Sequence, residues 1–266
     1  MSYARPAAVA GRFYPLDPAE LRRQVDAYMP AGQPVSARPK ALIAPHAGYV
    51  YSGPIAGQAY ARLAGARGSI ERVVLLGPAH FVRLRGLALP EAGAFETPLG
   101  TIPVDAAAAR TLADLPQVVI TDRPHAPEHS LEVQLPFLQQ TLGTFSLVPL
   151  VVGDATFEEV SEVLERLWGV PETLIVVSTD LSHYLDYAAA RQMDTATAAA
   201  IEALRPEAIG LDAACGRIPL GGLLSLARRQ GMRIERLDLR NSGDTAGPRH
   251  QVVGYGAWAL YEAGTA

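Results

Sequence analysis

Two residue types that often carry protein chemistry are almost missing from this chain. Lys40 is the only lysine, so Schiff-base or P-loop chemistry would depend on that one side chain, and its surroundings match neither. Cys215 is the only cysteine, which excludes intrachain disulfides and a zinc site built from several cysteines. We interpret Cys215 as a small buried residue ahead of a helix rather than as a nucleophile.

Long apolar runs and an excess of positive charge are also absent. No apolar run is long enough to span a bilayer, and the first residues lack the apolar core of a signal peptide. The net charge of −4 leaves no excess of positive charge that would bind nucleic acid. We therefore expect a cytoplasmic protein that binds neither membranes nor nucleic acid.

Apolar strand-like runs alternate with helical segments along the 266 residues. The clearest runs are KALIAPH, ERVVLLGPAH, FSLVPLVVGD and ETLIVVSTDLSH, and the stretch AFETPLGTIPVD has the Pro and Gly turns of a hairpin. This alternation predicts an α/β fold whose sheet is covered by helices on both faces. A single domain over residues 1–266 is the most economical organisation.

Most of the six histidines stand where a predicted strand ends. The three clearest are His46 after KALIAP, His80 after RVVLLGPA and His183 after LIVVSTDLS. The ends of strands are where α/β proteins place ligand-binding groups, and imidazole is the commonest metal ligand. Each histidine alone is typical of an ordinary loop residue, but His46 and His80 on two strand ends together favour a pair of metal ligands.

The segment STDLSHY carries Asp180 and His183. An acid three residues before a histidine can ligate a metal, relay protons or orient a ligand. The alternative is that the Ser, Thr and Asp residues of this segment only cap a helix. A serine-hydrolase role for Ser178 or Ser182 is disfavoured because the chain has no G-x-S-x-G turn.

A second acidic segment, HAPEHSLEVQLP, carries His125, Glu128, His129 and Glu132. If a helix begins at Ser130, Glu132 lies one turn from His129 and could orient it by a hydrogen bond. Capping and the helix dipole explain Glu132 equally well. Both interpretations stay open at this stage.

A carboxylate is needed if the metal is iron held by two histidines and one acid. Asp244, between Gly243 and Thr245, and Asp180 are the two candidates. Asp beside Gly is otherwise typical of a turn.

An ordered series of motifs resembles the Memo family, known as protein B of the AmmeMemoRadiSam system. The motifs cover nearly the whole chain: VAGRFYP, APHAGYVYSG, LLGPAH, FETPLG, EHSLEVQLPFL, VPLVVGD, VSTDLSHY, ACGRIPLGGLL, NSGDTAG and VVGYGA. Memo proteins resemble class III extradiol (LigB-type) non-haem iron dioxygenases. The resemblance implies a central mixed sheet, helices on both faces and one cleft.

The resemblance also implies a metal site. The histidines of its PHAGY and GP-x-H motifs fall on His46 and His80. The third ligand of animal members is a cysteine in a late loop, and the loop NSGD places Asp244 there, which favours Fe(II) over copper or zinc. The family's remaining motifs match His129, Asp180 and His183, which would surround the metal as acid–base groups or as groups that orient its ligands.

Three functions follow as hypotheses. The first is an iron-dependent, dioxygenase-like oxidoreductase of unknown substrate, with radical-SAM and AMMECR-type proteins as partners. The second is a non-catalytic module that binds a ligand or phosphopeptide in the same cleft. The third is a zinc hydrolase that uses the same ligands and a water molecule.

Overall fold

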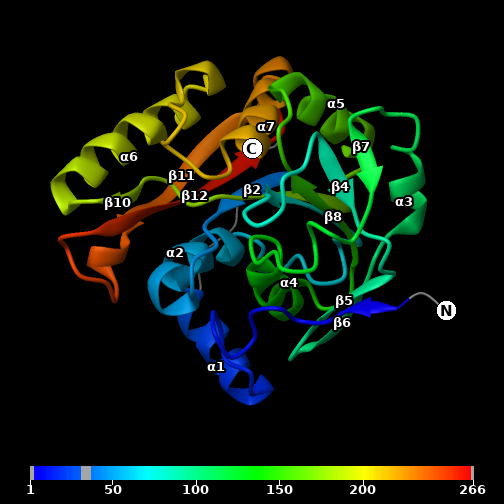
Figure 1. Cartoon of the computed structure of the whole chain (residues 1–266), viewed down its shortest axis with the longest axis horizontal. Coiled ribbons are helices and arrows are strands. Elements are labelled where there is room, and N and C mark those ends of the chain that lie inside the picture. Colours follow the sequence, from blue (N-terminus) through cyan, green and yellow to red (C-terminus); the bar gives the residue numbers. More distant parts are fainter. Residues whose placement is uncertain (1–2, 31–36, 265–266) are drawn as a thin grey trace.

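The structure is a computed structural model that describes residues 3–30 and 37–264. Its centre is a nine-stranded mixed sheet with the order β10-β12-β2-β9-β3-β8-β4-β7, and β11 pairs with β12 (Figure 1). The strands are β2 (Ala41–Ala44), β3 (Arg72–Pro78), β4 (Leu87–Leu89), β7 (Val118–Ile120), β8 (Ser146–Val152), β9 (Thr173–Ser178), β10 (His183–Leu185), β11 (Arg233–Asn241) and β12 (Val252–Tyr261).

The four central strands β2, β9, β3 and β8 run parallel, and β12 and β4 join them antiparallel on either side. Their side chains alternate between two apolar clusters. In β3, Val74 and Leu76 face one cluster, while Val73 and Leu75 face the other. Because both faces of the sheet are covered, each strand is a continuous apolar run rather than an alternating one.

Helices pack on both faces of this sheet (Figure 1). One face is covered by α1 (Pro18–Tyr28), α2 (Tyr49–Ala61) and α4 (Leu135–Leu142), and the other by α3 (Ala106–Arg110), α5 (Phe157–Leu167), α6 (Tyr187–Glu202) and α7 (Arg217–Arg229). This arrangement confirms the predicted α/β class with a mixed sheet. None of the helices among the described residues has the length and apolar character needed to cross a membrane.

A smaller sheet, β1-β5-β6, contains the predicted hairpin. The strands are β1 (Ala4–Arg5), β5 (Ala94–Thr97) and β6 (Gly100–Pro103), and β5 pairs antiparallel with β6. Short 3-10 turns complete the described structure: η1 (Glu132–Gln134), η2 (Pro206–Ala208) and η3 (Ser242–Asp244).

The helix predicted from Ser130 begins later than expected. Residues 132–134 form η1, and the α-helix starts only at Leu135, with Pro136 in its first turn. A proline is tolerated there because its missing N–H would have no helical partner. Two other helices begin directly after a capping residue. Asp17 caps α1, and Thr156 forms a capping box with Glu159 at the start of α5.

Candidate metal centre

The candidate site lies at the carboxyl ends of three adjacent parallel strands. His46 follows β2, Asp180 follows β9 and His80 follows β3, and β9 lies between the other two strands in the sheet. The structure brings the two rings together, with a distance of 5.2 Å between the centroids of His46 and His80. Parallel strands all end at the same edge, so neighbouring strand ends bring their loops together.

Hydrogen bonds fix the orientation of the His46 ring. Its Nδ1 lies 2.9 Å from Oγ of Ser178, and this hydroxyl already donates to the Ser130 carbonyl at 2.6 Å. The Ser178 oxygen must therefore accept from Nδ1–H, which leaves the lone pair on Nε2. Burial, followed by the nearby His80, lowers the pKa of His46 well below its usual range, so the ring is neutral.

Glu128 orients His80 in a similar way. Its Oε1 accepts from Nδ1–H of His80 at 2.8 Å, and its Oε2 accepts from the His80 backbone N–H at 2.7 Å. Burial disfavours the charged carboxylate, but the contacts with His80 and the backbone N–H of Ser130 outweigh burial and lower the pKa of Glu128 to about 2. The Nε2 lone pair of His80 is therefore also available.

The third group at this point is the only thiol in the chain. Sγ of Cys215 lies 3.2 Å from Nε2 of His46. One ligand atom from each of His46, His80 and Cys215 lies within 4.8 Å of the other two. Burial and the nearby Asp180 carboxylate raise the pKa of the Cys215 thiol to about 12, so the cysteine is a thiol unless a cation replaces its proton.

Two backbone hydrogen bonds hold Cys215 in place ahead of α7. Its own N–H donates to the Asp180 carbonyl at 3.2 Å, and Gly216 N–H donates to the Thr179 hydroxyl at 2.9 Å. A side chain at Gly216 would collide with Thr179, because an added Cβ would lie 2.6 Å from its Cβ. The loop therefore docks directly on the end of β9.

The expected third ligand, Asp244, is not part of this group. It lies in η3, where Oδ2 accepts from the Asn241 backbone N–H at 3.1 Å and Oδ1 accepts from the Tyr187 hydroxyl at 2.6 Å. Among the described residues, Asp244 belongs to neither group of side chains that could hold a metal. The structure therefore places this carboxylate in a turn, outside both groups, and Cys215 is the third member of the group that contains His46 and His80.

Glu132 also differs from the expectation, because it does not orient His129. The carboxylate is fully buried and accepts hydrogen bonds only from the N-terminal segment. Arg5 pairs with it at 2.8 Å, and its other donors are the backbone N–H groups of Ala8 and Val9 and the Tyr14 hydroxyl. Glu132 thus anchors the N-terminal segment, and Glu128 takes the place predicted for it beside the histidines.

His129 stacks on the His80 ring with a centroid distance of 4.7 Å. Its Nδ1 is buried without a hydrogen bond, 3.4 Å from Oε1 of Glu128. Burial, then the neighbouring His46, lowers the pKa of His129 to about 4. His80, Glu128 and His129 form a second set of ligand atoms within 4.8 Å, which shares His80 with the first.

Asp180 and His183 lie beside the same centre. One oxygen of Asp180 accepts from the His46 backbone N–H at 2.7 Å, and burial raises the pKa of Asp180. Nδ1 of His183 donates to the Leu181 carbonyl at 2.8 Å, which leaves its Nε2 as an acceptor. The helix that the alternative interpretation required begins later, at Tyr187 with Asp186 as its cap.

His46, His80, His129, Asp180 and His183 line a cleft with a volume of about 530 Å³, whereas Cys215 lines a neighbouring pocket with Pro78 and Ala79. The remaining wall of the cleft is largely aromatic and apolar, from Phe13, Tyr51, Tyr184, Pro248, Val253 and Tyr255. The Phe13 ring lies 4.8 Å from His129. Ligand clefts typically combine such apolar walls with a few convergent polar groups.

Two histidines lie outside the cleft. His125 is buried beneath the small sheet and donates from Nε2 to the Ala88 carbonyl at 2.9 Å, and burial lowers its pKa to about 4. His250 is exposed in the last loop. The cleft therefore contains four of the six histidines, and these are the four predicted from the sequence as site residues.

The sequence interpretation missed Cys215 and Glu128 as site residues. Glu128 immediately precedes His129, but two acids in that segment fit an orienting role and the wrong one was chosen. Cys215 had one usable signal, since it is the only thiol and stands before a glycine at the start of a helix.

Comparisons with known proteins agree with this fold and these motifs. The profile of a family described as "Memo: Memo-like protein" matches residues 5–259. A "MEMO1 family protein" of Aquifex aeolicus is 35% identical, with 94% of this chain and 97% of that protein covered. One of Aeropyrum pernix is 36% identical, with coverages of 95% and 98%. The chain therefore belongs to the Memo family.

A solved structure shares the fold at low sequence identity. It is the crystal structure of the uncharacterized protein JW3007 from Escherichia coli K12. The TM-score is 0.58 and the identity 15%, with 84% of this chain and 100% of that chain covered. This likeness concerns the fold alone.

Proposed function

We propose that this Memo-family protein is a metal-dependent oxidoreductase whose metal is held by His46, His80 and Cys215. The observation that carries the proposal is the convergence of two Nε2 lone pairs and one thiol. In both histidines the other ring nitrogen is used, by Ser178 for His46 and by Glu128 for His80. Metal-binding histidines typically have such a partner on the second nitrogen, which fixes the tautomer and the ring orientation.

The donor set determines which metals fit. Iron(II) is the metal implied by the resemblance to extradiol dioxygenases, and we keep it as the first metal to test. The sequence argument for iron relied on the Asp244 carboxylate, however, and Cys215 replaces it with a soft thiolate. Two imidazoles and a thiolate also suit copper and zinc. A bound redox-active metal would supply the electron-transfer chemistry that no side chain in the cleft can provide.

The other polar groups of the cleft would handle protons and position the substrate. His183 holds a proton on Nδ1, so its Nε2 would accept a proton from a substrate hydroxyl, and His129, which also lines the cleft, is the second candidate base. Asp180 fixes the loop of His46 through the backbone N–H and faces the same cleft. The aromatic wall would bind the apolar part of the substrate and exclude water from it.

The family resemblance also suggests partners. We propose that the radical-SAM and AMMECR-type proteins of the same system act with this protein. A cleft of about 530 Å³ is sufficient for a small molecule or for one or two side chains of a peptide.

Metal analysis and oxygen consumption test the proposed function. The metal content would be measured in protein purified without chelators. The iron-loaded and copper-loaded forms would then be assayed for oxygen uptake with a panel of catechols and other phenols. The expected result is about one metal ion per chain and metal-dependent oxygen uptake that His46→Ala abolishes. Zinc as the only retained metal would instead support a hydrolase.

A non-catalytic binding function is the second candidate, favoured by the largely aromatic wall of the cleft. It predicts that a ligand of the cleft binds equally well before and after metal removal. If no metal supports oxygen uptake and the ligand binds equally well without metal, the binding function would replace the enzymatic proposal.

A further inference from the structure

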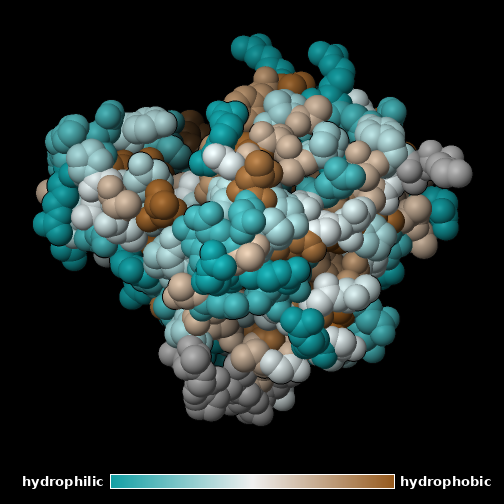
Figure 2. All heavy atoms as spheres, turned by 90° about the horizontal axis from the view of Figure 1, so that it is seen from below, coloured by the Kyte–Doolittle hydropathy of each residue, from teal (hydrophilic) through white to brown (hydrophobic). Residues whose placement is uncertain are grey.

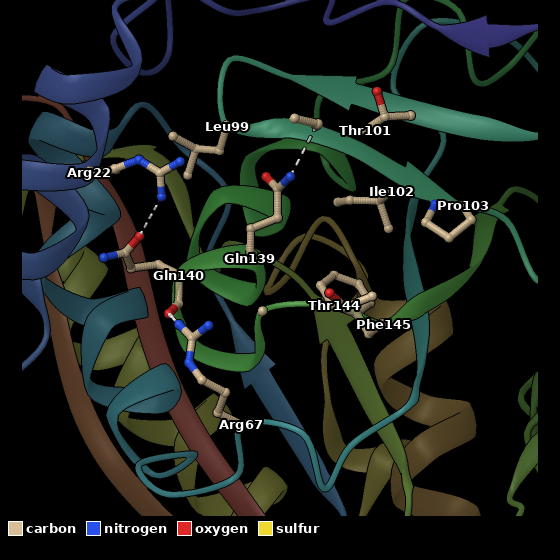
Figure 3. Close-up of a pocket in the computed structure, with 12 residues that line it drawn as sticks. Arg22, Arg67, Leu99, Thr101, Ile102, Pro103, Gln139, Gln140, Thr144 and Phe145 are labelled. Carbon is tan, nitrogen blue, oxygen red and sulfur yellow. Dashed lines mark hydrogen bonds between the residues drawn. The ribbon is translucent and has the colours of Figure 1, made fainter.

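A second pocket lies away from the histidine cleft and shares no lining residue with it. It has a volume of about 300 Å³ and is bounded by α1, the β5–β6 hairpin, the loop after α2 and the end of α4 (Figure 3). Its lining residues are Arg22, Arg67, Leu99, Gly100, Thr101, Ile102, Pro103, Gln139, Gln140, Gly143, Thr144 and Phe145. Two of these residues carry a positive charge and none carries a negative one.

The two guanidinium groups lie on either side of Gln140 (Figure 3). Arg22 donates from Nη1 to the Gln140 side-chain oxygen at 3.4 Å, and Arg67 donates from Nη2 to the Gln140 carbonyl at 2.6 Å. Both acceptors are neutral, and each guanidinium has five N–H groups. Most donors of this pair are therefore available to a ligand.

Neither arginine forms an ion pair within residues 3–30 and 37–264. Some other surface arginines do: Arg85 pairs with Glu159 and Arg166 with Asp114. The acid on α1 that lies one turn after Arg22, Asp26, accepts instead from the Gln140 side-chain amide at 2.8 Å. No carboxylate in the described part of the chain therefore forms a direct ion pair with either arginine of the pocket.

The rest of the pocket offers neutral donors on a fixed frame. Gln139 is held on both sides of its amide, because it accepts from the Thr97 hydroxyl at 2.6 Å and donates to the Gly100 carbonyl at 3.1 Å. The Thr144 hydroxyl forms no hydrogen bond with other described residues and lines the pocket, whereas the Thr101 hydroxyl is directed away from the two arginines (Figure 3). A ligand with several acceptor oxygens would satisfy these groups.

Gly143 allows Arg67 to approach the pocket. It has φ 79°, and an added Cβ would lie 2.7 Å from Nη1 of Arg67. A simple capping role explains the contact of Arg67 with the last turn of α4. It does not explain Arg22, which comes from another helix and meets the same residue from the opposite side.

We propose that Arg22 and Arg67 form a binding site for a small phosphate monoester. Guanidinium groups bind phosphate through paired, charge-assisted hydrogen bonds, and a tetrahedral phosphate has enough oxygens to accept from both arginines. The surrounding face is mostly hydrophilic, with only separate small apolar areas (Figure 2). This fits a soluble ligand rather than a lipid surface.

Calorimetric titration of the full-length protein in phosphate-free buffer tests this site. The probes are inorganic phosphate and glycerol 3-phosphate, with sodium chloride as the control for general screening. We expect saturable binding at one site. Arg22→Ala and Arg67→Ala should each weaken it about tenfold, the double variant should abolish it, and Arg67→Lys should fall between, since it keeps the charge but loses the planar fork.

Arg123→Ala is the matched control, because Arg123 is also exposed and unpaired among the described residues but lies outside the pocket. It should leave phosphate affinity within roughly twofold of the parent value. Arg22 is on the surface of α1, so Arg22→Ala should leave the fold intact. It therefore still tests the site if Arg67→Ala alters the end of α4. Thermal unfolding of each variant identifies any such loss of stability.

Absence of saturable binding, or equal binding by the double variant, would overturn the proposal. Binding only to vesicles that contain phosphatidic acid, with none to glycerol 3-phosphate, would overturn it as well and indicate a membrane ligand. The titration is also repeated on metal-depleted protein, where the phosphate affinity should be unchanged. The test of this site therefore does not depend on the proposed function.

Discussion

The thiol of Cys215 lies 3.2 Å from Nε2 of His46, although 169 positions separate the two residues in the chain. Ser178 holds the proton of this ring on Nδ1, so the nitrogen that faces the sulfur carries the lone pair. With His80 beside them, these groups form a candidate donor set for a metal ion.

The identity of the third ligand gives the first prediction. Cys215→Ala should reduce the bound metal from about one ion per chain to near zero, because two neutral imidazoles alone hold a divalent ion weakly. Asp244→Ala is the matched control and should keep its metal, since that carboxylate only closes a turn and contacts Tyr187. Elemental analysis of both proteins, purified in parallel without chelators, measures the difference. Metal loss in the Asp244 variant alone would restore the ligand set expected from the sequence.

The second prediction concerns Glu128. Glu128→Gln removes the charge that holds Nδ1–H of His80 and leaves only one oxygen able to accept a hydrogen bond. Metal affinity should fall by about 10–100-fold, as is usual when a ligand histidine loses its orienting carboxylate. Competition with a chelator of known affinity measures the change. Glu158→Gln, an exposed change on α5, should not alter the affinity.

The third prediction concerns the buried ion pair of Arg5 and Glu132. Glu132→Gln leaves the Arg5 cation buried without its counter-ion, so the free energy of unfolding should decrease by about 3–5 kcal/mol. Replacing both partners by apolar residues, in Arg5→Met with Glu132→Leu, should be more harmful than the single change, because Leu leaves the N–H groups of Ala8 and Val9 and the Tyr14 hydroxyl without an acceptor. Urea unfolding of metal-depleted proteins supplies the values. A double variant more stable than Glu132→Gln would contradict this interpretation.

The fourth prediction is a pH dependence that comes from His125. Burial lowers its pKa from 6.5 to about 4 in the folded protein, so below pH 6.5 the unfolded chain binds a proton that the folded one does not. The contribution of His125 to the free energy of unfolding is therefore constant above pH 6.5 and decreases as the pH falls toward 4. The maximum decrease is about 3 kcal/mol.

The variant His125→Gln isolates this contribution. Its amide can still donate to the Ala88 carbonyl but does not titrate, so stability should decline less steeply between pH 6.5 and 4 than in the parent protein. Unfolding by urea at several pH values gives both slopes. Parallel slopes would show that His125 does not cause the acid sensitivity.

Much of the fold follows from local patterns in the sequence. Strands such as β3 and β9 are continuous apolar runs because both faces of the sheet are covered, and the sequence therefore predicted them well. The hairpin of β5 and β6 was also predicted, from its Pro and Gly turn residues. The short β10 was not predicted, because it is defined by its pairing with β12 and has no apolar pattern of its own.

The amino-acid sequence by itself determined the family, the α/β class and the position of His46 and His80 at strand ends, because each depends on short-range patterns. Only the tertiary structure decided which other groups meet these rings. Glu128 and Glu132 are four positions apart and of the same residue type, yet one faces His80 and the other pairs with Arg5. Likewise, Cys215 reaches the site because its loop packs on the end of β9, a long-range contact that no local pattern specifies.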